Sequence, residues 1–299
     1  MTSTGPHGAS HSMTINPGFD LVGGALLAVV FAILLIIESL APLRQRVVAR
    51  LRSLRTNLAV AAIGTVALRL LLVPVVLAVA TLAEQHDFGL LRLVALPGAV
   101  EILAGFVLFD YTIYLWHRAT HGVPFLWRFH RVHHSDLDLD VSTAFRFHAG
   151  ELVLSIPVRA AQVALLGLSP ALALAYEIAF ELATEFHHSN WRLPFGLERR
   201  LHWGLVTPRM HGLHHSIVER ETNANWGVVF AWWDRLHGTL RLGVPQNEVV
   251  IGLPAHRDPA LSLGALLALP FGVQVPAFVL PDGRPAERDE PAERGRIQA

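Results

Sequence analysis

Long apolar segments constrain the fold of this sequence more than any other feature. Residues 21–37 form a run of 17 positions without a charged side chain. With its flanks, such a run is just long enough, as a helix, to span about 30 Å of hydrocarbon. A second run, residues 58–82, is interrupted only by Arg69, and a third, residues 94–116, ends directly before His117. We therefore expect three membrane-spanning helices.

The composition agrees with a chain that exposes much of its surface to lipid. Hydrophobic residues make up 52% and charged residues 16% of the chain, whereas a typical soluble chain carries roughly 25% charged residues. The 24 basic and 24 acidic residues balance, so no global positive field exists to attract nucleic acid. The sequence has no cysteine, which excludes disulfides, thiolate zinc sites, iron–sulfur clusters and cysteine nucleophiles.

The remaining apolar segments are shorter or broken. Residues 152–186 are interrupted by Gly167 and by Ser169 and Pro170. This leaves two arms too short for full spans and predicts a helical hairpin that dips into the membrane. Residues 261–280 contain two prolines and predict a broken interfacial helix. We therefore expect an all-α fold in which multi-pass membrane helices carry a cytosolic helical cap.

The sequence predicts one structured domain with two loose ends. Residues 1–17 are polar and small, which predicts a flexible N-terminus, and residues 281–299 are charged and rich in proline, which predicts a disordered tail. Residues 18–280 are expected to form a single integral-membrane domain. Its chemistry is expected in residues 105–239, where the histidine motifs lie.

A cluster of arginines predicts the orientation in the membrane. Five arginines lie within residues 44–55, directly after the first apolar run. The positive-inside rule assigns this segment to the cytoplasm and the N-terminus to the opposite side. The third span then returns to the cytoplasm, and the hairpin leaves and re-enters on that side. We therefore expect every histidine motif, and the active site, to face the cytoplasm.

Histidine is strongly over-represented, with 17 in the chain and most of them in residues 117–215. Three motifs stand out, one HxxxH and two copies of HxxHH, and their members are His117 and His121, then His130, His133 and His134, then His211, His214 and His215. In a helix, rings at i and i+4 point in nearly the same direction, so each motif can present its imidazoles together. His148, His187 and His188 lie between the second and third motifs.

This pattern points to metal binding. Neutral imidazole is the commonest metal ligand, and a nitrogen-rich site suits iron, zinc, copper or nickel better than magnesium or calcium. The eight motif histidines, with one or two of the three that lie between, would saturate two metal ions. HExxH, the zinc peptidase motif, is absent, and the motifs lack the glutamates of soluble di-iron bundles. An all-histidine dinuclear site is the interpretation that is left.

Seven runs follow one another in the order DYTIYLWHRATH, FLWRFHRVHHSD, RFHAGE, FHHSN, TPRMHGLHHS, NWG and WWDRLHGT. As an ordered set they resemble the fatty acid hydroxylase/sterol desaturase superfamily of integral-membrane di-iron enzymes. The HxxxH spacing of the first motif is similar to that of sterol desaturases and alkylglycerol monooxygenases rather than fatty acid 2-hydroxylases. The resemblance implies two iron ions, with O2 as co-substrate, that attack an unactivated C–H bond of a lipid.

When the family's ligand positions are matched to this sequence, the resemblance implies that the eight motif histidines are ligands and that His188 is the ninth. His187 stands where glutamine is common, and His148 lies in a motif that departs from the family's by one residue, so for both a ligand role and a supporting role stay open. Two further departures, Trp226 and His237, are expected to touch no ligand. The candidate metal ligands are His117, His121, His130, His133, His134, His148, His187, His188, His211, His214 and His215.

Three further residues are candidates for catalytic support, because a ligating imidazole usually donates its other N–H to a carboxylate or carbonyl. Asp110 lies two helical turns before His117 on the same face. Glu181 is the middle one of three glutamates spaced at i, i+4 and i+8 before His188. This stripe could orient ligands or line a proton path, and a hydrated helix seam is the alternative. Asn190 follows directly in the same motif.

The resemblance implies a lipid hydroxylase, with a lipid or sterol desaturase on the same site as the alternative. Electrons would come from a separate ferredoxin, cytochrome b5 or reductase, because no haem module or flavin fingerprint is recognisable in the chain. From a different class, a histidine-lined metal transporter predicts ligands near the bilayer midplane, whereas these motifs lie at helix ends. The lipid and the oligomeric state stay open, and zinc could replace iron in purified samples.

Overall fold

The computed structural model describes residues 17–257 and 261–288, and within them it contains helices and no β-strand. The all-α fold expected from the sequence is confirmed. In chain order the elements are α1 (Pro17–Leu40), α2 (Arg50–Ala67), the π-helical η1 (Leu68–Leu72), α3 (Val73–Gln85), η2 (Leu90–Arg92), α4 (Gly98–Gly122), α5 (Pro124–His134), η3 (Val141–Phe145), α6 (Ala149–Leu166), α7 (Pro170–His188), α8 (Phe195–Leu201), α9 (Pro208–His214), α10 (Glu219–Thr222), α11 (Trp232–Leu236), η4 (Pro254–His256) and α12 (Leu263–Ala268).

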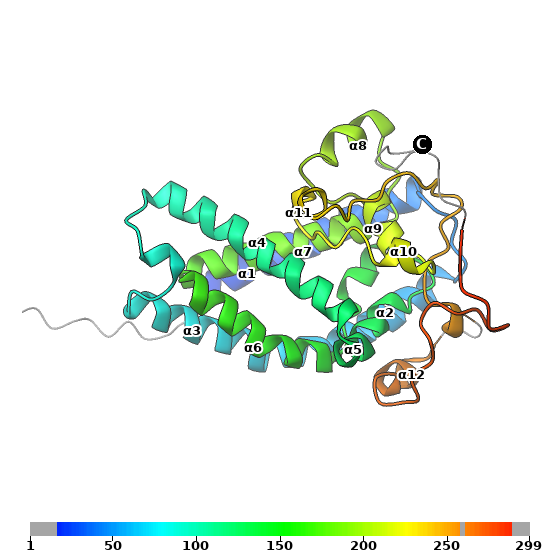
Figure 1. Cartoon of the computed structure of the whole chain (residues 1–299), viewed down its shortest axis with the longest axis horizontal. Helices are drawn as coiled ribbons and strands as arrows, with labels where there is room; N and C mark the ends of the chain where they lie inside the picture. Colours follow the sequence, from blue (N-terminus) through cyan, green and yellow to red (C-terminus); the bar gives the residue numbers. More distant parts are fainter. Residues whose placement is uncertain (1–16, 258–260, 289–299) are drawn as a thin grey trace, which may run out of the picture.

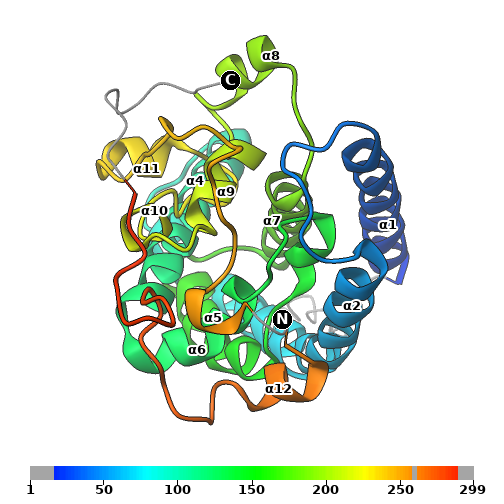
Figure 2. The ribbon, with the colours of Figure 1, turned by 90° about the vertical axis from the view of Figure 1, so that its right-hand side faces the viewer.

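The long helices form a bundle along the longest axis of the molecule, and the short helices gather at one end of it as a cap (Figure 1). α1, α3, α4, α6 and α7 belong to the bundle, and α8 to α12 belong to the cap. Figure 2 looks onto the capped end, where segments from both halves of the chain meet.

Four helical segments are long and apolar enough to cross a membrane, namely Val22–Leu40, Arg50–Arg92, Gly98–Gly122 and Ala149–Leu166. The first three contain most of each expected span. The fourth is α6, the first arm of the expected hairpin, so the expectation that both arms are too short to span is wrong for α6. The arms are also held apart, because α3 and α4 each pack against both α6 and α7.

The second span belongs to a longer helical run than the apolar pattern predicted. α2, η1 and α3 follow one another without a break, and α2 continues to the cap, where it packs against η3 and α12. Arg69 lies in the π-helical η1. Because a π turn has a wider ring than an α turn, the positions after Arg69 face a different side of the bundle from the one an uninterrupted α-helix would give them.

The break in the fourth apolar segment is the turn between α6 and α7. Gly167 ends α6 in the left-handed conformation with φ 75°, which glycine adopts at no steric cost. Gly167 packs so closely on Gly89 that a Cβ atom on Gly89 would clash with the backbone of Gly167. Ser169 then caps α7 by accepting a hydrogen bond from Leu172 N–H, and Pro170 occupies the first turn.

The C-terminal segment runs over the cap. Residues 261–280 hold one short helix, α12, which agrees with the prediction of a broken helix. Residues 281–288, placed in the tail expected to be disordered, make contacts in the structure: Ala286 N–H donates to Phe278 O at 2.8 Å, and Arg288 lies 3.6 Å from Glu221. The rest of that tail and residues 1–16 of the expected N-terminal segment lie outside the described residues.

Candidate metal centre

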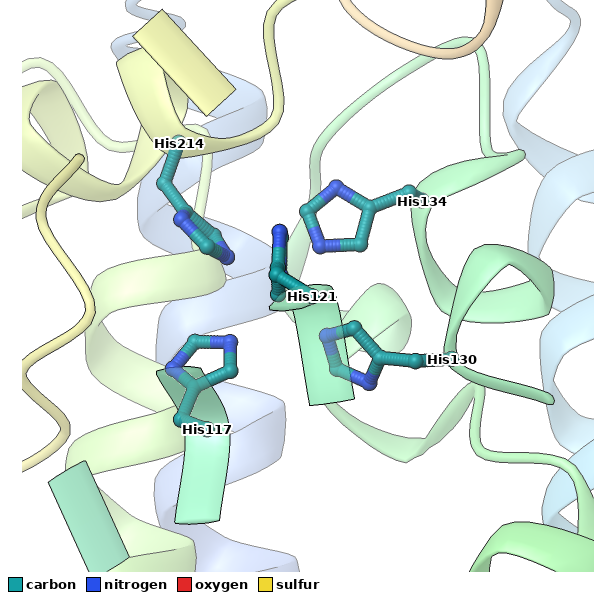
Figure 3. Close-up of side chains that lie close together, drawn as sticks. All are labelled: His117, His121, His130, His134 and His214. Atoms are coloured by element: carbon teal, nitrogen blue, oxygen red, sulfur yellow. The ribbon is translucent and has the colours of Figure 1, made fainter. Parts of the chain in front are cut away.

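The first group of histidines forms where α4, α5 and α9 meet. His117 and His121 lie one turn apart at the end of α4, and Pro124 starts α5 almost at once, so the two helices present their i, i+4 pairs to each other. The members of this group, called group A, are His117, His121, His130, His134 and His214. One ring nitrogen from each lies within 4.8 Å of the others, and Figure 3 shows the five side chains close together, with His121 in the middle of the view.

The second group, called group B, joins α5, α7 and α9, and its members are His133, His188, His211 and His215. Nε2 of His188 lies 3.0 Å from Nε2 of His133 and 2.9 Å from Nε2 of His211, and His211 Nε2 lies 3.1 Å from His215 Nε2. Two nitrogens bound at about 2.1 Å to one ion and at right angles to each other would be about 3.0 Å apart. The spacing in group B therefore suits ligands of one cation.

Backbone carbonyls hold several of these rings by the nitrogen that faces away from the group. Nδ1 of His117 lies 2.9 Å from Trp226 O, Nδ1 of His214 lies 2.9 Å from Ala224 O, and Nδ1 of His188 lies 2.8 Å from Thr184 O. A carbonyl oxygen can only accept, so each Nδ1 carries the proton and donates it. The lone pair of each ring is thereby left on Nε2.

One ring is held by a carboxylate that the sequence analysis did not single out. Nδ1 of His130 lies 2.7 Å from Oε1 of Glu151, and both side chains are buried. Glu151 is the last residue of the RFHAGE run, in which only His148 was predicted to have a role. A carboxylate partner orients a ligating imidazole and raises its basicity. In this run it is therefore Glu151, and not His148, that supports a ring of group A.

The donor set fits metal ions of the iron or zinc type. Several ring nitrogens are buried and make no hydrogen bond: both nitrogens of His121, Nε2 of His130, His134 and His214, and Nδ1 of His133, His211 and His215. Burial and the neighbouring imidazoles lower the pKa of His133, His134, His211, His214 and His215 well below its usual value. Neutral imidazoles with unused lone pairs are what such ions require.

Two candidate ligands lie outside both groups. His148 caps α6: its Nδ1 accepts a hydrogen bond from Gly150 N–H at 2.9 Å, and its Nε2 lies 3.2 Å from Leu267 O. His187 is buried with Nδ1 3.2 Å from Val228 O, and its ring packs against His211 with 4.0 Å between ring centres. The structure brings the other nine candidate histidines together and leaves these two beside them.

The residues predicted to support the ligands, Asp110, Glu181 and Asn190, do not hydrogen-bond to the grouped histidine rings. Asp110 accepts hydrogen bonds from Tyr176 Oη at 2.8 Å and Trp233 Nε1 at 2.7 Å, and from the backbone N–H groups of Val229 and Phe230. It therefore fastens the loop that follows Trp226, whose carbonyl holds His117, and touches no histidine ring itself.

Asn190 also acts on a loop. Its side chain accepts from Arg44 N–H and donates to Arg44 O, both at 2.9 Å, and its own N–H donates to the buried Glu38. These contacts tie the segment after α1 to the end of α7. Glu181 lies in the wall of a cavity, described below, and not among the rings.

The expectation that Trp226 touches no ligand is wrong. Its carbonyl accepts the His117 Nδ1–H, and its ring lies 6.3 Å from that of His121 in an edge-to-face arrangement. His237 does stay clear of the groups, because its ring stacks on Tyr114 and its Nε2 lies 3.1 Å from Tyr111 Oη.

The anchoring role of Asp110 gives a testable expectation. Asp110→Ala leaves the buried hydroxyl of Tyr176 and the indole N–H of Trp233 without an acceptor, which costs roughly 3 kcal/mol. We expect a lower midpoint of thermal unfolding and a lower metal content in purified protein. Asp282→Ala, which removes a carboxylate bonded only to the exposed Arg284 within the described chain, is the control. Equal unfolding midpoints for the two variants would contradict the role.

A mostly apolar cavity, called the inner chamber, lies beside both groups. Its wall includes rings from group A, such as His117 and His130, and from group B, such as His133, and also apolar side chains such as Phe147 and Phe180. The cavity volume is about 110 Å³, below the roughly 300–1,000 Å³ of pockets that enclose a whole small ligand. It therefore has room for part of a hydrocarbon chain beside the two histidine groups.

Comparison with known proteins agrees with this geometry. Residues 102–239 match the family model described as fatty acid hydroxylase. The match begins in α4 and ends just after α11, so it contains all nine grouped histidines. Over this segment the chain is similar to the fatty acid hydroxylases, and its four long apolar helices support a membrane protein whose histidine groups could hold metal.

The relatives it matches act on different lipids. Ornithine lipid hydroxylase OlsE of Rhizobium tropici is 31% identical over 58% of this chain and 51% of its own length. Human cholesterol 25-hydroxylase is 31% identical over 47% and 51%, and human alkylglycerol monooxygenase is 31% identical over 48% and 31%. The chain thus spans about half the length of the first curated relatives it matches. No solved structure matches it.

Proposed function

We propose that this protein is a membrane-bound di-iron oxygenase that hydroxylates an unactivated C–H bond of a lipid, using O2 and electrons from outside. The observation that carries the proposal is the convergence of nine mostly buried imidazoles in two groups beside one apolar cavity. The hydroxylase and monooxygenase names of the relatives support the same reaction class. A metal transporter is not favoured, because the groups lie at the capped end of the bundle.

In this proposal groups A and B each hold one iron ion, and His148 and His187 are supporting residues. Iron bound there supplies the reductive activation of O2. The residues of the chain orient the ligands. The backbone carbonyls of Trp226, Ala224 and Thr184 keep a proton on Nδ1 of one ring each, and the rings are those of His117, His214 and His188. The Nε2 lone pairs of these rings then face the ions.

The inner chamber supplies selectivity and protection. Its apolar wall excludes water from the reacting carbon and holds a hydrocarbon chain beside both groups. Phe147 stacks on His133 with 4.4 Å between ring centres, so it closes one side of group B to solvent.

We also propose that the chain is multi-pass with the metal centre on the cytoplasmic side, because the arginine cluster at residues 44–55 lies at the same end of the bundle as the cap. A separate one-electron donor would then dock on the cap from the cytoplasm. Ferredoxin, cytochrome b5 or a reductase would serve as this donor.

The test is a comparison of lipids in a bacterial host that expresses the chain and in one that does not. We expect lipid species heavier by one oxygen atom, found by mass spectrometry only when iron and O2 are supplied. Species lighter by two hydrogen atoms would instead favour the desaturase. An iron-loaded, reduced protein that changes no lipid would overturn the proposal.

A further inference from the structure

A second cavity, called the outer chamber, opens beside the inner one. Its wall includes Gly23 and Gly24 of α1, Val76 of α3 and Ile178 of α7. Four residues line both chambers, namely Leu68, Leu72, Glu177 and Glu181. The two chambers therefore adjoin at a wall made by η1 and α7.

Polar side chains mark this junction in otherwise apolar surroundings. Arg159 of α6 is only 7% exposed, and its Nη1 lies 3.4 Å from Oε1 of Glu177 without forming a hydrogen bond. Its guanidinium lies over the rings of Phe109 and Phe180, at 5.6 and 5.2 Å. A buried Nη1 with an unused N–H and a wall position in the inner chamber is a donor for a group that enters it.

Glu181 supplies the complementary acceptor. It lies one helical turn beyond Glu177 and lines both chambers. Among the residues that the structure describes, it makes neither a hydrogen bond nor a salt bridge, although Glu177 and Arg159 both lie near enough to act on it electrostatically. A carboxylate facing an apolar cavity without a partner is costly, and a ligand that donates a hydrogen bond to it removes that cost.

The two groups together discriminate between kinds of lipid. A hydroxyl group can donate its proton to Glu181 and accept from Arg159 at the same time. An ammonium group could pair with Glu181, but it has no lone pair for the N–H of Arg159 and would leave that buried donor without an acceptor. A carboxylate or phosphate would meet the negative charges of Glu177 and Glu181. The junction therefore fits a neutral hydroxyl best.

We propose that Glu181 is a specificity-determining residue which, with Arg159, binds the hydroxyl group of a neutral lipid alcohol while its hydrocarbon part lies against the metal centre. The inference rests on the proposed function, since it names the substrate class of the same site. Glu181 and His188 are seven residues apart on α7, which corresponds to about 10 Å. The oxidised carbon is therefore expected about 10 Å from the bound hydroxyl.

The test measures binding without turnover. Iron-loaded protein in nanodiscs, kept without reductant, is offered hexadecanol, cholesterol, hexadecylamine and palmitate, and the bound lipid is quantified by mass spectrometry. We expect at least one of the two alcohols to bind about tenfold or more tightly than the amine and the acid, a difference of about 1.4 kcal/mol. Glu181→Leu should abolish this preference, and Glu181→Gln should keep part of it.

The control is Glu101→Leu, which removes a carboxylate of α4 that pairs with Arg92 and lies outside both chambers. It should keep the preference, and all variants should retain two metal ions per chain as evidence of folding. Binding of neither alcohol, equal or tighter binding of the amine, or an unchanged preference in Glu181→Leu would overturn the inference. Preference for alcohols without any oxygenated product would instead contradict the proposed function alone.

Discussion

Replacing His211 by alanine is expected to reduce the metal content from two ions per chain to one and to abolish lipid oxidation. Nε2 of His211 lies within 3.1 Å of the same atoms of His188 and His215, so the substitution removes a central member of group B and leaves group A intact. Product formation should fall by about three orders of magnitude or more, as when one member of a unit that acts together is lost. Elemental analysis and product mass spectrometry measure the two effects.

His148→Ala is the matched control for this experiment. It removes another buried histidine from the same candidate set, but one whose nitrogens cap α6 and face Leu267 O. We expect two metal ions and a loss of about 1 kcal/mol of stability, the usual value of a helix cap. The assignment of ligands to group B fails if His211→Ala keeps both ions, or if His148→Ala loses one.

Glu151→Gln is expected to weaken metal binding without removing a ligand. The carboxylate of Glu151 accepts from His130 Nδ1 at 2.7 Å, whereas an amide is a weaker acceptor and can turn its NH2 group toward the ring. Loss of such a partner typically costs 10–100-fold in metal affinity or activity. Competition with a chelator measures the affinity, and we expect the loss in the ion held by group A.

Glu101→Gln makes the same chemical change where the carboxylate pairs with Arg92, and its metal affinity should equal that of the unaltered protein. An affinity of Glu151→Gln within a factor of two of this control would show that the hydrogen bond to His130 does not tune the site. A loss confined to group B would contradict the geometry as well, because His130 belongs to group A.

The histidine motifs predicted which rings gather, because local spacing limits where rings can point. His130 and His134 share a helical face at i, i+4, and His133 of the same helix points to the other group. The assignment of individual rings to two ions depends on how α4, α7 and α9 pack against α5. No spacing within one motif contains that information.

The supporting residues were predicted less well. Asp110 was expected to hold a ring because it shares a face of α4 with His117, yet it binds Tyr176 and Trp233. Glu151 holds a ring although it lies 21 residues from its partner in sequence. Hydrogen bonds between distant segments depend on tertiary packing, and helical periodicity does not predict them.

By itself the amino-acid sequence indicated that the chain enters a membrane and carries clustered histidines that could hold metal, because hydrophobic run length and the spacing of imidazoles are local properties. Only the tertiary structure decided that nine histidines divide into groups of five and four, that Glu151 and three carbonyls orient rings, and that Glu177 and Glu181 lie where two mostly apolar chambers adjoin. The physical reason is that each of these features joins helices far apart along the chain, and their contact is set by packing of the whole bundle.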